Sequence, residues 1–83
     1  MTYQEFRAQL AGEPADPQIA AYRSERTLRN LLKLTHTKQT EAARLFGVPL
    51  RTVQGWCLGE REIPPYLLDL IAYILITEGG ETK

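Results

Sequence analysis

The stretch from Thr37 to Gly59 constrains this chain most, because it holds two short amphipathic segments separated by a glycine. In the first segment, Ala42, Ala43 and Phe46 fall on one side of a helix. Gly47 can end that helix with a positive φ, which glycine adopts without steric cost. The stretch therefore predicts two helices joined by a tight turn, each with an apolar face to bury against the other.

The second segment places its apolar and polar side chains on different faces. Val53 and Trp56 share one face of the predicted helix, whereas Arg51 and Gln54 point away from it. Outward arginine and glutamine side chains on a short helix are the groups that bond base edges in the major groove of DNA. The alternative is an ordinary corner of two helices with no nucleic-acid role, but the exposed face lacks the Glu and Lys residues of a merely solvated helix.

Residues 39–59 resemble the helix-turn-helix of the Cro and phage-repressor family, whose pattern runs roughly Thr-Gln-x-Glu-x-Ala-x-x-x-Gly-Val-Ser-x-x-Thr-Val-x-x-Trp-x-x-Gly. The matching positions are Gln39, Glu41, Ala43, Gly47, Val48, Thr52, Val53, Trp56 and Gly59. Two features depart from the family: Pro49 stands in place of the capping serine, and Cys57 and Leu58 replace a charged pair. The resemblance implies a lambda-repressor-like all-α fold, a compact bundle of about five short helices, in a phage or mobile-element regulator of transcription.

The length of 83 residues predicts a single domain. We expect an N-terminal helix and turn over 1–16, a core over 24–76 and a frayed tail over 77–83. A chain of this size buries only about 60% of the surface of its unfolded state, which favours a homodimer.

Local signals predict where several helices begin and end. Thr2 and Glu5 have the spacing of a capping box, and Asp16, which precedes a proline, is a predicted N-cap. A break is expected near Ser24, which could cap a separate helix. Thr37 is the predicted N-cap of the first motif helix.

The charges are unevenly distributed although the formal net charge is zero. Residues 22–51 hold seven basic and two acidic side chains, a net +5, whereas residues 1–21 carry −2 and residues 52–83 carry −3. A local field, rather than the total charge, steers a charged partner. The basic segment adjoins the motif and favours a nucleic-acid partner, with a solvated helix face as the alternative for residues 23–33.

The predicted DNA contacts fall into two groups. For base edges we expect Arg51 to bond guanine and Leu50 to touch a thymine methyl, while Gly55 lets the backbone approach the DNA closely. Gln54 is expected either to pair with adenine or to make a looser contact. Phosphate contacts are expected at the helix starts and flanks. These candidates are Lys38, Gln39, Arg44 and Thr52. The family resemblance implies one more, Arg61, because the loop after the second motif helix passes beside the DNA backbone in related repressors.

The C-terminal segment 66–76 is apolar except at Asp69. A helix that is apolar nearly all round is buried on more than one side. One side can close the core, and the other is predicted to bind a second copy of the chain. The dimer candidates are Tyr73, Ile74 and Ile76. Alternatively, the N-terminal helix covers this side within the monomer.

These features predict a dimeric, autoregulatory repressor that binds an inverted repeat in double-stranded DNA. Its half-sites would be centred about 34 Å apart. No catalytic arrangement, cofactor or metal site is expected, because Cys57 and His36 are single and nothing beside them could act with them. No membrane segment or targeting signal is apparent, so a cytoplasmic location is expected. The alternative function is a protein-binding module, such as an antitoxin that grips a partner protein and represses its own promoter.

Overall fold

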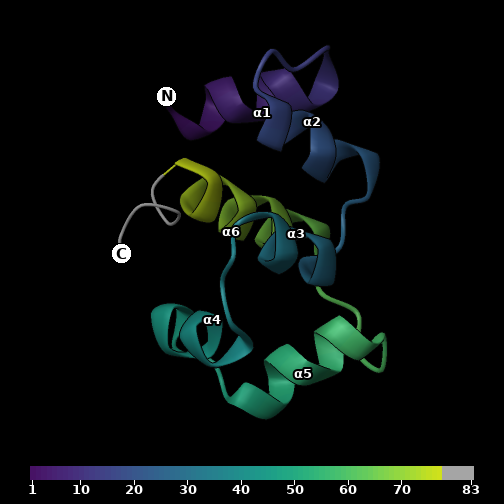
Figure 1. The fold of residues 1–83 in the computed structure, drawn as a ribbon, viewed down its shortest axis with the longest axis vertical. Coiled ribbons are helices and arrows are strands. Elements are labelled where there is room, and N and C mark those ends of the chain that lie inside the picture. The colour runs from purple at the N-terminus through teal and green to yellow at the C-terminus, as the bar shows by residue number, and fades with distance from the viewer. Residues whose placement is uncertain (78–83) are drawn as a thin grey trace.

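The computed structural model describes residues 1–77, which form an all-α bundle without strands (Figure 1). Its helices are α1 (Tyr3–Ala11), α2 (Pro17–Ser24), α3 (Leu28–Leu34), α4 (Gln39–Phe46), α5 (Leu50–Leu58) and α6 (Pro65–Thr77). The predicted all-α class is confirmed. The described part has six helices rather than about five, because segment 17–35 forms two separate helices.

The capping signals at the start of the chain act as predicted. The Thr2 N–H donates to Glu5 Oε1 at 2.8 Å, and the Glu5 N–H donates to Thr2 Oγ1 at 3.1 Å. Asp16 caps α2 by accepting the Gln18 N–H at 2.8 Å. Each bond satisfies a donor that the first turn of a helix leaves without an intrahelical partner.

The break near Ser24 is confirmed, but Ser24 caps no helix. It is the last residue of α2, and the N-cap of α3 is Thr27. The Thr27 hydroxyl accepts the Asn30 N–H at 3.1 Å. Three residues separate the two helices, so the cap lies later in the sequence than predicted.

The prediction of Thr37 as the N-cap of α4 is wrong. Its hydroxyl lies 2.9 Å from that of Thr35, and the N-cap is Lys38, which has no side-chain cap. The Lys38 N–H instead donates to Glu41 Oε1 at 3.0 Å. This carboxylate therefore stabilises the first turn of α4.

His36 ends α3 in a left-handed conformation with φ 55°. The next N–H, of Thr37, donates to the Leu32 carbonyl at 2.9 Å, and the His36 N–H donates to the Lys33 carbonyl at 3.3 Å. This is the bond pattern of a Schellman C-cap, in which glycine is the usual residue. His36 therefore holds the connection to α4 in a backbone conformation that a side chain disfavours.

The helices are arranged along the long axis of the molecule (Figure 1). Helices α1 and α2 occupy one end, α4 and α5 occupy the other, and α3 and α6 lie between them. Helix α1 packs against α2 and α6, α2 also packs against α3 and α6, and α5 packs against α3 and α4. The α4–α5 unit is thus attached to the rest mainly through α3.

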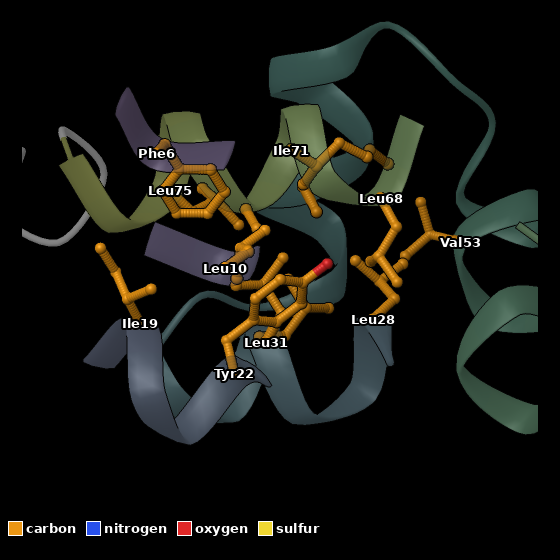
Figure 2. Close-up of a cluster of buried hydrophobic side chains, with 14 residues drawn as sticks. Phe6, Leu10, Ile19, Tyr22, Leu28, Leu31, Val53, Leu68, Ile71 and Leu75 are labelled. Carbon is orange, nitrogen blue, oxygen red and sulfur yellow. The ribbon is translucent and has the colours of Figure 1, made fainter. Parts of the chain in front are cut away.

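One cluster of buried side chains links all six helices (Figure 2). The largest fully buried members are Tyr22, Phe6, Ile19, Leu31, Leu75 and Val53. Since three of these precede residue 24, the expected core of 24–76 is too short at its N-terminal side. Of the expected tail, Thr77 belongs to α6, and residues 78–83 lie outside the described part.

Helix α1 covers part of α6 within the monomer. The Tyr73 ring meets those of Tyr3 and Phe6 edge to face, with centroid distances of 5.5 and 5.7 Å, and its hydroxyl donates to the Met1 carbonyl at 2.8 Å. The alternative, in which the N-terminal helix covers this side of the C-terminal helix, is therefore confirmed at the Tyr73 ring. Tyr73 is correspondingly removed from the predicted dimer contacts, because its own chain packs against it.

The acidic residue of α6 is buried with two partners. Asp69 Oδ1 accepts the Tyr22 hydroxyl at 2.7 Å, and Oδ2 pairs with the Arg26 guanidinium. Burial, reinforced by the carboxylate, raises the pKa of Tyr22 well above its usual range, and the bond to Asp69 raises the pKa of Arg26. This network joins α2, the α2–α3 connection and α6, and it explains a charge in an otherwise apolar helix.

Candidate nucleic-acid interface

The α4–α5 unit has the tight turn that the sequence predicts. Gly47 ends α4 with φ 66°, and the Val48 N–H donates to the Ala43 carbonyl at 3.1 Å. Pro49 is the N-cap of α5 and offers no side-chain bond, while Gly59 ends α5 with φ 81°. Glycine C-caps therefore define where α4 and α5 end, and a proline precedes the first residue of α5 in place of a side-chain cap.

Helix α5 buries one face and exposes the opposite one. Val53 is 1% exposed, and Trp56 and Phe46 are half-buried against the core. Arg51 and Gln54 are exposed. The predicted helix over 50–58 is confirmed, as is the outward direction of its two polar side chains.

An open hollow of about 500 Å³ lies where α3, α4 and α5 meet. Its lining includes Arg29, Lys33, Lys38, Gln39, Leu50 and Gln54. Among the described residues, none of the side chains that line it is acidic. Three cationic groups therefore surround a surface that also carries two of the predicted base-reading side chains.

The hollow joins residues from both predicted groups. Lys38 and Gln39 of the phosphate group lie beside Leu50 and Gln54 of the base-reading group. Arg51 is exposed on the same helix but lies outside the hollow. The site thus combines the start of α4 with the first half of α5.

Two cations of this hollow were absent from the predicted contacts. Arg29 and Lys33 are exposed on α3, four residues apart, on the side away from its buried leucines. That spacing places both on one helix face. The signal was present in the sequence, but only the packing of α3 against α5 shows that this face adjoins the motif.

Two other predicted phosphate ligands lie outside the hollow. Arg44 is exposed on α4, away from the face that buries Ala42 and Ala43. Thr52 is half-buried, and its N–H donates to the Pro49 carbonyl at 2.9 Å. The structure therefore does not gather these two residues with Lys38 and Gln39.

The prediction that Gly55 offers bare backbone to DNA is wrong. Gly55 is buried, because the side chain of Arg61 lies over it. A Cβ at this position would be 3.0 Å from Arg61 Cδ and 3.2 Å from Cγ. The missing side chain makes room for another part of the same protein.

The charged groups around the site are free of ion pairs within residues 1–77. The ion pair found in that part joins Arg26 and Asp69, away from the hollow. Cys57 also lines the hollow, but burial raises the pKa of its thiol. The charged side chains that line the hollow are the cations Arg29, Lys33 and Lys38, and the amides of Gln39 and Gln54 lie beside them.

Comparisons with protein-family models, curated proteins and solved structures found no match for this chain. Over residues 1–77, no helix has the length and hydropathy to cross a bilayer, and no group of His, Cys, Asp and Glu side chains could hold a metal ion. The geometry and charge of the α3, α4 and α5 surface are therefore the basis for assigning a function.

Proposed function

We propose that this chain is a sequence-specific DNA-binding transcriptional repressor that places α5 in a major groove. Arg51 would bond guanine, Gln54 would bond adenine and Leu50 would touch a thymine methyl. The observation that carries this proposal is the exposure of Arg51 and Gln54 on a short helix that borders a hollow with three cations.

The cations of the hollow suit the phosphates of one DNA strand. Lys38 and Gln39 lie at the start of α4, where Glu41 already accepts the Lys38 N–H, so the Lys38 ammonium and the Gln39 amide would contact the phosphates. Arg29 and Lys33 extend the positive surface along α3. These contacts would set the register and the affinity of the complex, while α5 would supply the sequence preference.

The proposal includes a two-fold dimer that binds an inverted repeat. Tyr66, Leu70 and Ile74 recur every four residues along α6 and form a stripe on one face. Tyr66 is 70% and Leu70 is 39% exposed, whereas Ile74 is half-buried. We assign self-association to this stripe, which includes Ile74, rather than to Tyr73. Ile76 is half-buried and, two residues beyond Ile74, lies on another face of α6.

The same exposed stripe supports a second candidate function. A surface of large apolar side chains can bind a different protein as well as a second copy. The chain would then resemble an antitoxin that grips a partner and represses its own promoter. The two functions differ in what occupies α6, whereas both use α5 to bind DNA.

Selection of fragments from a random duplex library by the purified protein tests the proposal. We expect enrichment of an inverted repeat whose half-sites are centred about 34 Å apart. Each half-site should include a guanine whose replacement weakens binding. Recovery of fragments with no shared sequence would contradict the proposed function, and recovery of single half-sites would contradict the dimer.

A further inference from the structure

Both the backbone and the side chain of Arg61 are held at Gly55. The N–H groups of Glu60 and Arg61 donate to the Gly55 carbonyl at 2.9 and 3.2 Å, which turns the chain back along α5. The Arg61 stem then covers the glycine, with Cδ, Cγ and Nε at 3.0, 3.2 and 3.5 Å from the position of an added Cβ. The Arg61 stem therefore lies against α5 in space that the missing side chain of Gly55 leaves.

The position of this contact relates it to the proposed reading face. Successive residues of a helix are about 100° apart, so Gln54 and Gly55 lie on two flanks of α5 with Arg51 between them. Gln54 borders the basic hollow. Arg61 borders a second hollow, shared with Trp56, on the other flank. A cation therefore lies on each side of the outward face of α5, and the second hollow also includes the acidic side chains of Glu62 and Asp69.

We infer that the space at Gly55 positions Arg61 to contact a phosphate of the second of the two backbones that border the major groove. A helix in that groove, about 12 Å wide, has a phosphate backbone on either side. The cations of the first hollow would meet one backbone, and Arg61 meets the other. This inference rests on the proposed function, since it takes α5 to lie in the groove.

The predicted ligand of Arg61 is a phosphate rather than a base edge because of where Arg61 contacts α5. Arg61 belongs to the connection after α5, which ends at Leu58, and it covers Gly55 on the flank away from Gln54. In helix-turn-helix proteins, the N-terminal residues of the recognition helix contact base edges. A guanidinium near the other end of the helix is closer to the groove wall, where it contributes to affinity for all sequences.

A contact inside the protein, between the Arg61 side chain and Gly55, accounts for the glycine at this position. An added methyl group would move the Arg61 stem by a few tenths of an ångström, which a flexible side chain permits. The variant Gly55→Ala should therefore fold, and alanine favours a helix more than glycine does. Its defect should lie in DNA affinity and should act through Arg61.

The test is a double-mutant cycle on a duplex that the wild-type protein selects, measured over a salt titration. Arg61→Ala should weaken binding about three- to tenfold and reduce the salt slope by about 0.9, the value for one phosphate contact. Gly55→Ala should lower affinity and slope in the same direction. The double variant should bind no more weakly than Arg61→Ala alone. Gly12→Ala, at the end of α1, is the matched control and should bind as the wild type does.

Three results would overturn the inference in distinguishable ways. Wild-type affinity and a wild-type salt slope in Gly55→Ala would show that Gly55 is not required to position Arg61. A loss from Gly55→Ala that persists undiminished beside Arg61→Ala would show that the added methyl group itself meets the DNA. A wild-type protein without sequence preference would overturn the proposed function together with the inference, whereas the first two results leave that function intact. Thermal unfolding of each variant confirms that folded proteins are compared.

Discussion

The two ends of this molecule use their side chains in opposite ways. Helices α1 and α2, together with the central helix α6 on which they pack, bury large residues and enclose a bonded carboxylate, as Phe6, Tyr22 and Asp69 show. The α4–α5 end contributes two alanines and Val53 to the same core, and it leaves Arg44 and Arg51 exposed. The contrast indicates that one end supplies most of the buried core, whereas the other carries the surface for which we propose DNA binding. Substitutions should therefore separate stability from DNA binding.

The largest effect is expected at the stabilising end. Phe6→Ala removes a ring that is 0% exposed and that packs against α6. It should lower the free energy of unfolding by about 3–5 kcal/mol, a large part of the total for a small domain. Urea denaturation measures the change. Leu45→Ala, at a residue 63% exposed on α4, is the control and should change stability by less than about 0.5 kcal/mol. Equal losses of stability in Phe6→Ala and Leu45→Ala would contradict the assignment of most of the stability to one end.

The next effect concerns the buried carboxylate. Arg26→Ala leaves Asp69, 3% exposed, with the Tyr22 hydroxyl as its remaining partner. The expected loss of stability is near the lower end of about 3–5 kcal/mol, because Arg26 itself is partly exposed. DNA affinity should be unchanged at a temperature where the variant is folded. Arg23→Ala, an exposed neighbour on α2, is the matched control for both measurements. A selective loss of DNA binding in Arg26→Ala would place Arg26 in the interface instead.

A smaller effect is expected at the binding end. Arg29→Ala should reduce the salt slope of DNA binding by about 0.9 and weaken binding to all sequences, because it removes one phosphate contact. Unfolding by urea should be unaffected, since Arg29 is exposed. An unchanged salt slope would remove Arg29 and its hollow from the phosphate surface.

The smallest effect tests the connection between the two ends. His36→Gly should raise the free energy of unfolding by about 0.5–1 kcal/mol, because glycine adopts a positive φ without the cost that a side chain brings. Thermal unfolding against the wild type measures it, with His36→Ala as the control that keeps the strain. Destabilisation by glycine would show that the histidine side chain makes a contact that matters.

Local chemistry was enough to predict much of the fold. Thr2 with Glu5, Asp16 before a proline, and Gly47 each act on residues within one helical turn, so their bonds can be inferred from spacing alone. The helix over 50–58 and the outward direction of Arg51 followed from the same short-range pattern. Errors arose where several residues compete for one role, as for Ser24 and Thr27.

Contacts between distant segments could not be predicted in this way. Asp69 and Tyr22 are 47 residues apart, and the sequence shows no sign that they share a hydrogen bond. The side chain of Arg61 reaches Gly55 because the chain turns back after α5, which reverses the predicted role of the glycine. Both contacts depend on how elements pack, which hydrophobic periodicity does not determine.

The most direct test of the account is the affinity of Arg51→Ala for the selected duplex and for a duplex with one half-site scrambled. Arg51 is exposed on α5, so stability should stay within about 0.5 kcal/mol of the wild type. The account predicts a loss of about 1–3 kcal/mol on the selected duplex and a relaxed preference at one base pair per half-site. Unchanged affinity and unchanged preference would show that α5 is not the helix that reads DNA.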